Sequence, residues 1–286
     1  MRRDKGSDPM IHTEGKFKTV AGASIYYQAW RPEGEPKAIL LVVHGLAEHC
    51  GRYMNVVNHF VPRGYAVFGL DLPGHGKSDG TRVYADGMAD FTNPLKTYFG
   101  MVQGWHPGTP IFMLGHSMGG LIGTCFLFDY QDKLKGAVIS APAVKVGASI
   151  SSVAIFLAKL LGQILPKLGL QGVDASAVSS DPQVVKDYIN DPLVYHGKTT
   201  ARLGAVLLDA IQRVTAEAGT LRLPFIVVQG SADTLVDPDG ARMLYDKASS
   251  HDKTIKIYDG YLHEVFNEPG RARVLQDVET WLGSHC

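Results

Sequence analysis

Apolar and polar positions divide the chain into short strand-like segments and longer amphipathic ones. Residues 16–20 and 24–30 flank an Ala-Gly-Ala turn and predict two antiparallel strands. Further strands are predicted where short, mainly apolar runs end at glycine, proline or polar residues: 38–43, 65–70, 111–114, 135–140, 223–229 and 253–258. The runs without a polar face are typical of strands buried on both sides of a sheet.

Helical patterns separate these strands. The segments 53–61, 87–105 and 121–128 predict helices. Strands that alternate with helices indicate the α/β class, with a mostly parallel central sheet and helices on both of its faces. In such sheets, functional groups gather at the carboxyl ends of the strands. We therefore look for a site in the loops that follow the strands.

One interval between strands is too long for a simple crossover. It lies between the strands at 135–140 and 223–229, contains helical patterns of its own, and predicts a cap inserted at residues 145–215. The rest of the chain is then a single core in two parts, as follows: residues 11–144 and 216–286, after a flexible leader at 1–10.

Part of this insertion, residues 148–165, is unusually apolar. Ser151, Ser152, Lys159 and Gln163 interrupt it, which argues against a membrane-spanning helix. A helix with so little polar face either packs into a core or dimer interface, or contacts lipid and substrate, and the sequence leaves both open. Any membrane contact is therefore expected to be peripheral and to involve the cap.

Composition restricts the partners. The 286 residues include 28 Lys and Arg against 28 Asp and Glu, so the chain lacks the basic surplus that nucleic-acid binding requires. Its three cysteines, Cys50, Cys125 and Cys286, are widely spaced and odd in number, which favours a reducing, cytoplasmic location over a disulfide framework or a zinc site. Residues 1–9 are charged without a following apolar stretch and do not resemble a secretory signal.

The strand at 111–114 runs into a sequence that indicates chemistry. Residues 115–119 read Gly-His-Ser-Met-Gly and are followed by a helical pattern, which is the strand, elbow and helix arrangement of a G-x-S-x-G motif. Glycines two residues before and after the serine let strand and helix approach while its hydroxyl stands clear. Ser117 is therefore the candidate nucleophile; the alternative is an ordinary serine in a Gly-rich turn.

A serine hydroxyl needs an imidazole base, and the imidazole needs a carboxylate partner. The usual chain order of serine, acid and histidine in this architecture restricts the base to histidines after Ser117: His196, His251, His263 and His285. His263 directly follows the last predicted strand and is the best candidate. The others fall in the cap, before that strand, or at the C-terminus.

The acid is expected soon after the strand at 223–229. Asp233 meets this condition, whereas Asp237 and Asp239 stand where the next helix begins and suit a capping role. We favour Asp233, with Asp237 as the alternative. Attack on an ester also needs two backbone N–H donors for the developing oxyanion.

Two loops can supply those donors. Met118, the residue after the nucleophile, provides one, and Leu46, in the loop after the strand at 38–43, provides the other. Beside Leu46, Gly45 permits the turn toward the site and the His44 side chain ties the loop down. His116, next to the nucleophile, is expected to pack beneath the elbow.

Four segments together resemble the monoacylglycerol lipases of the α/β-hydrolase superfamily. They are residues 44–53, 71–78, 114–120 and 229–233, and the similarity runs from about residue 12 to the C-terminus. It includes the cap, where Asp191-Pro192-Leu193 follows Tyr188 as in that family, and the tail at 261–269 looks like its bacterial branch.

The resemblance implies a fold, a triad and a binding pocket. The fold is the α/β-hydrolase fold with an inserted helical cap; the triad is Ser117, Asp233 and His263, with Leu46 and Met118 as the oxyanion hole. It also implies that the polar pocket for the glycerol end is near three residues: Glu48, Arg52 and Tyr188.

This chain departs from the mammalian members at three positions. Val236 and Tyr195 replace their cysteines, so thiol reagents that act there are not expected to inhibit it. Phe266 stands where they carry a polar histidine, which leaves the completion of the glycerol pocket open.

The expected function is serine hydrolysis of monoacylglycerol to glycerol and fatty acid, without a metal or an organic cofactor. Lysophospholipase or general carboxylesterase activity is an alternative, because the cap decides the substrate. A noncatalytic ligand-binding relative is a third reading, which the complete set of triad candidates disfavours. Acyl length, positional preference and oligomeric state are not predicted.

Overall fold

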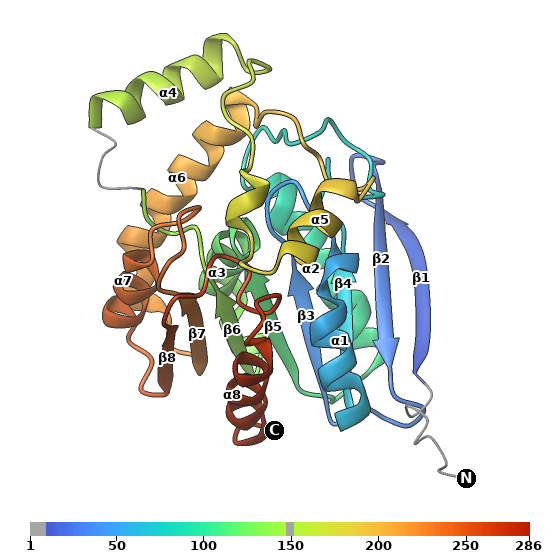
Figure 1. The fold of residues 1–286 in the computed structure, drawn as a ribbon. Helices are drawn as coiled ribbons and strands as arrows, with labels where there is room; N and C mark the ends of the chain where they lie inside the picture. The colour runs from blue at the N-terminus through green and yellow to red at the C-terminus, as the bar shows by residue number, and fades with distance from the viewer. Residues whose placement is uncertain (1–9, 147–151) are drawn as a thin grey trace.

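Eight strands form one sheet in the computed structural model, which describes residues 10–146 and 152–286 (Figure 1). They are β1 (Ile11–Lys18), β2 (Ser24–Arg31), β3 (Ala38–Val43), β4 (Tyr65–Leu70), β5 (Ile111–His116), β6 (Gly136–Ser140), β7 (Phe225–Gly230) and β8 (Lys253–Tyr258). Their order is β1-β2-β4-β3-β5-β6-β7-β8. β1 and β2 are antiparallel and the pairs from β4 to β8 are parallel, which confirms the mostly parallel sheet.

The strand predictions are accurate where both faces of a strand are buried. β3 and β4 have the predicted bounds, and every residue in them is buried. β1 begins at Ile11, five residues earlier than expected, because this edge strand is largely exposed and lacks an apolar pattern. β7 begins at Phe225 rather than residue 223, since Pro224 has no backbone N–H to donate to a neighbouring strand.

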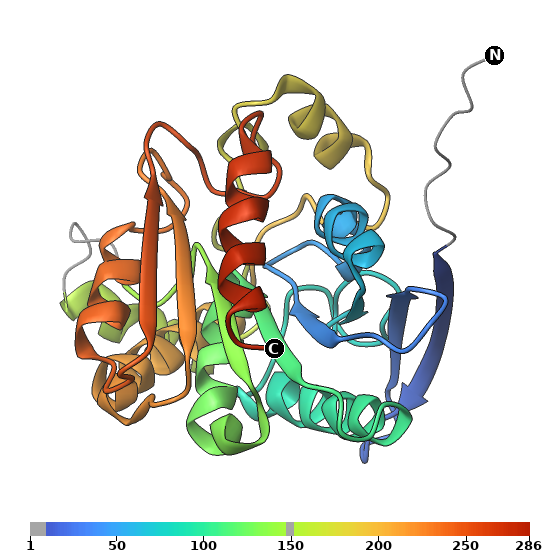
Figure 2. The same ribbon diagram turned by 90° about the horizontal axis from the view of Figure 1, so that it is seen from below.

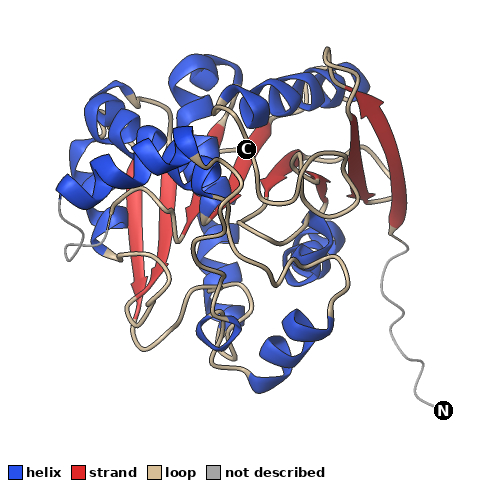
Figure 3. Cartoon of the chain, turned by 90° about the horizontal axis from the view of Figure 1, so that it is seen from above, coloured by secondary structure: helices blue, strands red, loops and turns tan. Residues whose placement is uncertain are grey.

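Eight α-helices are present in the described ranges. They are α1 (Met54–Phe60), α2 (Ala89–Trp105), α3 (Met118–Tyr130), α4 (Ser152–Ile164), α5 (Pro182–Asn190), α6 (Ala201–Glu217), α7 (Asp239–Lys247) and α8 (Arg271–Gly283). α1 and α8 cover one face of the sheet, whereas α2, α3 and α7 pack on the other, as the view from below shows (Figure 2). The view from above shows helices on both sides of the strands (Figure 3). The predicted helices on both faces are therefore present.

The helix predicted at 53–61 is divided into three pieces. A 3-10 turn at Cys50–Tyr53 precedes α1, and a second turn at Val61–Arg63 follows it. His49 caps the first turn, because its side chain accepts a hydrogen bond from the Gly51 N–H. Gly64, with φ +84°, ends the second turn in the left-handed conformation that favours glycine.

The interval predicted as a cap contains α4, α5 and most of α6, all inserted between β6 and β7. α4 lies at the top of the molecule on α6, over the end of the sheet where the parallel strands finish (Figure 1). The expected boundary at residue 215 falls inside α6, which continues to Glu217. Residues 147–151, which include the start of the apolar stretch, and residues 1–9 of the leader lie outside the described residues.

Hydrogen bonds tie the inserted segment to the core at several places. The Tyr195 N–H donates to the Ala47 carbonyl at 2.8 Å, and His49 Nε2 contacts Asp191 Oδ2 at 2.8 Å. Thr200 Oγ1 donates to the Val83 carbonyl at 2.7 Å. Within 10–146 and 152–286, none of the helices has the length and hydropathy that a bilayer crossing requires.

Candidate active site

Ser117 occupies a strained turn between β5 and α3. Its φ of 55° and ψ of −120° lie in a region of backbone conformation that residues other than glycine rarely adopt. The glycines of the motif are needed for close approach: a Cβ at Gly115 would lie 2.6 Å from the Gly119 carbonyl oxygen, and one at Gly119 would lie 2.0 Å from that of Val43. The serine side chain is thus presented at the carboxyl end of the sheet.

His263 and Asp233 meet beside this serine although 30 residues separate them. His263 Nδ1 lies 2.7 Å from Asp233 Oδ2, and both side chains are buried. The other carboxylate oxygen accepts the backbone N–H groups of Leu235 and Val236, at 2.9 and 3.1 Å. Burial raises the pKa of Asp233, but the hydrogen bond and charge of His263 and the other donors outweigh it, and the net shift is downward.

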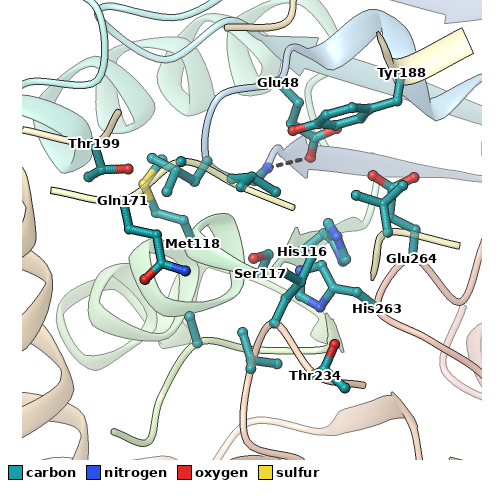
Figure 4. Close-up of a pocket in the computed structure, with 18 of the residues that line it drawn as sticks. Glu48, His116, Ser117, Met118, Gln171, Tyr188, Thr199, Thr234, His263 and Glu264 are labelled. Carbon is teal, nitrogen blue, oxygen red and sulfur yellow. Dashed lines mark hydrogen bonds between the residues drawn. The ribbon is translucent and has the colours of Figure 1, made fainter. Parts of the chain in front are cut away.

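One cavity of about 310 Å³ connects the candidate residues. Ser117 and His263 both line it, and both are labelled in the close-up of this cavity (Figure 4). No Ser117–His263 hydrogen bond is formed among the described residues; in unliganded enzymes such contacts are often long and tighten when substrate binds. Apolar side chains form much of the wall: Leu46, Met118, Ala143, Val173, Val178, Leu207, Leu235 and Val236.

The two predicted oxyanion donors face this cavity from separate loops. Leu46 follows β3 and Met118 begins α3, and both line the cavity. Among the described residues, neither of their backbone N–H groups donates a hydrogen bond within the protein. Ala47, directly after Leu46, has φ 64°, so strained backbone flanks both donors.

Four polar side chains form what we call the polar end of the cavity: Glu48, Arg52, Tyr188 and Glu264. Arg52 Nη1 donates to Glu48 Oε2 at 2.8 Å, and Arg52 Nη2 donates to Glu264 Oε2 at 2.8 Å. The guanidinium also lies 4.6 Å from the centre of the Tyr188 ring. Figure 4 shows Glu48, Tyr188 and Glu264 on one side of Ser117, with Met118 and Gln171 on the other.

The other histidines fall into different places. His285 pairs with Asp252 at 2.8 Å, His251 is exposed just before β8, and His196 packs its ring against Tyr188 in the cap. His116 is buried beneath the elbow, with its ring centre 4.7 Å from that of His263. His44 ties down the Leu46 loop, as expected, because its Nε2 accepts the Leu72 N–H at 2.8 Å.

Three buried imidazoles around the elbow and its neighbouring loops, those of His44, His75 and His116, are neutral. Burial lowers the pKa of His44 to about 4, and it lowers the pKa values of His75 and His116 to about 3. His75 stands next to His44, with 5.3 Å between their ring centres, and its Nδ1 lies 3.0 Å from the Pro73 carbonyl oxygen. The core around the elbow and its neighbouring loops therefore depends on uncharged histidines.

The free energy of unfolding is expected to fall on acidification because of these three histidines. The unfolded imidazoles bind protons below about pH 6.5, whereas the folded ones stay neutral down to about pH 4, so the unfolded chain takes up more protons in that window. Their stabilising effect is complete above pH 6.5 and is lost as the pH falls. We expect each buried imidazole to lower the free energy of unfolding by about 2 kcal/mol between pH 7 and pH 5, as measured by urea unfolding.

A matched pair of variants checks this pH dependence. His75→Gln removes one buried imidazole and is expected to reduce the fall by about a third, whereas His251→Gln removes an exposed one and leaves it unchanged. An equal pH dependence in both variants would contradict the explanation.

Two polar residues of the site were not picked out from the sequence. Gln229 Nε2 donates to Asp233 Oδ2 at 2.9 Å. The sequence feature that could have indicated this role is an amide side chain near the end of an otherwise apolar strand. Glu264, next to His263, was considered only as part of the tail at 261–269, and its contact with Arg52 joins positions 212 residues apart. Asp237 instead accepts the Asp239 N–H at 3.0 Å, at the start of α7.

Within the described ranges, no cluster of three His, Cys, Asp or Glu side chains is arranged to hold a metal ion. The chemistry that the cavity can support with its own residues is nucleophilic attack by Ser117, proton transfer through His263, and hydrogen bonding to an oxyanion by two backbone N–H groups. Val236 lines the cavity, and Phe266 is buried in the core formed with α1 and α8.

Comparisons with known proteins identify similar chains over nearly the full length. A family model described as "Serine aminopeptidase, S33" matches residues 34–270. The chain is 39% identical to a monoacylglycerol lipase of Mycolicibacterium smegmatis, over 96% of this chain and 98% of that one, and 35% identical to a monoglyceride lipase of Rattus norvegicus, over 91% and 87%. The crystal structure of Paleococcus ferrophilus monoacylglycerol lipase superposes with a TM-score of 0.79 at 32% identity, covering 96% of this chain and all of that one.

Proposed function

The chain belongs to the monoacylglycerol lipase family of the α/β-hydrolase superfamily, and on that premise we propose that it hydrolyses monoacylglycerols to glycerol and free fatty acids. It is a carboxylic ester hydrolase, and the proposed reaction proceeds through an acyl-enzyme on Ser117. The observation that carries the substrate class is the cavity: Ser117 lies between an apolar wall and the polar end, which suits a molecule with a long acyl chain and a small hydroxylated head.

In the proposed mechanism Ser117 Oγ attacks the ester carbonyl carbon as its proton passes to His263 Nε2. Asp233 holds Nδ1 of the ring as the donor and stabilises the resulting imidazolium. The carbonyl oxygen becomes an oxyanion that the Leu46 and Met118 N–H groups bind. Glycerol leaves with the proton from His263, and water then repeats the sequence to release the fatty acid and restore Ser117.

A panel of three substrates tests the proposed function. We expect kcat/KM for a medium- or long-chain monoacylglycerol to exceed that for lysophosphatidylcholine of the same acyl chain by about tenfold or more, because the head must fit a small buried polar end. p-Nitrophenyl butyrate reports the intact triad without using that end. Comparable rates on both lipids would favour the lysophospholipase alternative, and activity on the butyrate alone would favour a general carboxylesterase.

We also propose peripheral membrane contact through α4 and the loop that follows it. Large apolar side chains are exposed along this segment, which we call the apolar edge: Phe156, Leu157, Leu160, Ile164, Leu165, Leu168 and Leu170. Phe156 and Ile164 are 65% and 66% exposed. An exposed apolar surface beside a lipid-binding cavity suits shallow insertion at a bilayer surface, from which a monoacylglycerol could enter.

The double substitution F156D/I164D tests this contact. Two charges on the apolar edge are expected to lower the vesicle-bound fraction, and kcat/KM on vesicle-borne monoolein, by about fivefold or more. Hydrolysis of dissolved p-nitrophenyl butyrate should change less than about twofold. Ile11→Asp places one such charge on exposed β1, at the opposite end of the molecule, and should leave all three measurements unchanged. Normal vesicle binding by the double variant would contradict membrane docking, and a lost dimer would indicate an interface between copies.

A further inference from the structure

The polar end contains one guanidinium held between two carboxylates. Arg52 donates to Glu48 through Nη1 and to both carboxylate oxygens of Glu264 through Nη1 and Nη2. All three side chains are at most 9% exposed. Glu264 receives a further hydrogen bond from Asn267 Nδ2 at 2.8 Å, so it is held firmly in this position.

Each of the two carboxylates accepts several hydrogen bonds. Glu48 accepts the Gly45 N–H and the Tyr53 hydroxyl, in addition to Arg52. Burial raises the pKa of Glu264, but the Arg52 charge and hydrogen bonds outweigh it and lower the pKa overall. Two negative charges and one positive charge leave the polar end with a net charge of −1.

The other groups that line the cavity do not cancel this charge. Arg52 is the one arginine or lysine among the described lining residues. His116 is neutral because burial lowers its pKa to about 3, and Asp233 adds a negative charge behind His263. A headgroup that enters here therefore meets a fixed negative potential whose single cation is already engaged.

We propose that Glu264 makes the polar end selective for uncharged, hydroxylated headgroups by excluding anionic ones such as phosphate monoesters. This inference rests on the proposed function and deepens it. A neutral polyol can donate its hydroxyls to the free lone pairs of Glu48 and Glu264. A phosphate monoester is mainly a dianion above about pH 6 and then has no O–H to donate. It must approach two carboxylates, and it must compete with Glu264 for the guanidinium of Arg52.

Glu264 is thus a specificity residue by repulsion as well as by hydrogen bonding. Replacing it with glutamine removes one negative charge, and an amide competes less well than a carboxylate for Arg52. The polar end then becomes neutral, and Arg52 becomes available to an anionic head. The substitution should therefore improve binding of a phosphate head more than it changes binding of a glycerol head.

Competitive inhibition of p-nitrophenyl butyrate hydrolysis measures this selectivity without relying on monoacylglycerol turnover. The two probes share a chain and differ in the head: 1-O-dodecylglycerol and dodecyl phosphate, each below its micellar concentration. In the wild type we expect the inhibition constant of dodecyl phosphate to be about tenfold or more higher than that of dodecylglycerol. In Glu264→Gln this ratio should fall about tenfold, mainly through tighter binding of the phosphate.

Two further variants keep the test decisive. Glu264→Asp retains the charge and should retain most of the discrimination. Glu268→Gln removes an equally buried carboxylate four residues away, which binds Ser180 outside the cavity, and should leave the ratio unchanged. A ratio in Glu264→Gln within twofold of the wild type would overturn the proposal. If that variant does not fold, the wild type decides alone, and equal inhibition by the two probes would overturn it.

The outcomes separate this inference from the proposed function. Strong discrimination between the two probes with poor turnover of monoacylglycerols would support the charge-selective pocket and contradict the proposed substrate. Good monoacylglycerol turnover with no discrimination between the heads would support the substrate and contradict the role of Glu264.

Discussion

Replacing Ser117 with alanine is expected to lower kcat/KM for monoacylglycerol hydrolysis by about 10⁴-fold to 10⁶-fold, because the proposed acyl-enzyme forms on the Ser117 hydroxyl. Labelling by a serine-directed fluorophosphonate probe should disappear in the same variant. Ser117 Oγ makes no hydrogen bond among the described residues. The free energy of unfolding, measured with urea, should therefore change by less than about 0.5 kcal/mol.

Ser117→Gly provides an independent control for the strained elbow. Glycine adopts a φ of 55° with ψ of −120° without the steric cost that serine or alanine incurs, which is about 1–3 kcal/mol. Part of this gain is offset because glycine makes the unfolded chain more flexible. We expect Ser117→Gly to be more stable than Ser117→Ala by about 1 kcal/mol and equally inactive. Residual labelling or near-normal turnover in either variant would contradict the assignment of the nucleophile.

The parts of this molecule that follow from local sequence were predicted well. β3 and β4 are recognisable because each is an unbroken apolar run, and burial on both faces requires that composition. The elbow is recognisable because its conformation requires small residues at fixed positions, and the close contacts of Gly115 and Gly119 show why. The acid was harder to assign, since a loop aspartate and a helix-capping aspartate look similar until the fold places them.

Contacts between distant loops could not be predicted from the sequence. The Glu264 carboxylate meets Arg52 because the loop after β8 and the turn before α1 converge over the sheet, which no periodicity records. The sequence left open how the polar pocket is completed when Phe266 replaces a histidine. In the structure Phe266 is buried in the core, and Glu264, two residues earlier, reaches the polar end.

Asp233→Asn is expected to lower kcat for ester hydrolysis by about 10³-fold to 10⁴-fold with a much smaller effect on substrate binding. The Leu235 and Val236 N–H groups fix one oxygen of this side chain, so the new amide nitrogen must take the place of the other. It then faces Gln229 Nε2 and His263 Nδ1, both of which donate in the wild type. His263 can avoid a contact between donors only by moving its proton to Nε2, and it then cannot accept a proton from Ser117.

Asp237→Asn is the matched control, because Asp237 was the alternative acid and lies four residues away. Its side chain accepts the Asp239 N–H and pairs with Lys145 at 3.0 Å, so the substitution should alter kcat by less than about twofold. The pH dependence of kcat separates a catalytic effect from a structural one. If His263 holds its proton on the wrong nitrogen, the rate falls at every pH where the wild type is active. Equal losses in both variants, or a larger loss at Asp237, would show that the acid has been assigned to the wrong residue.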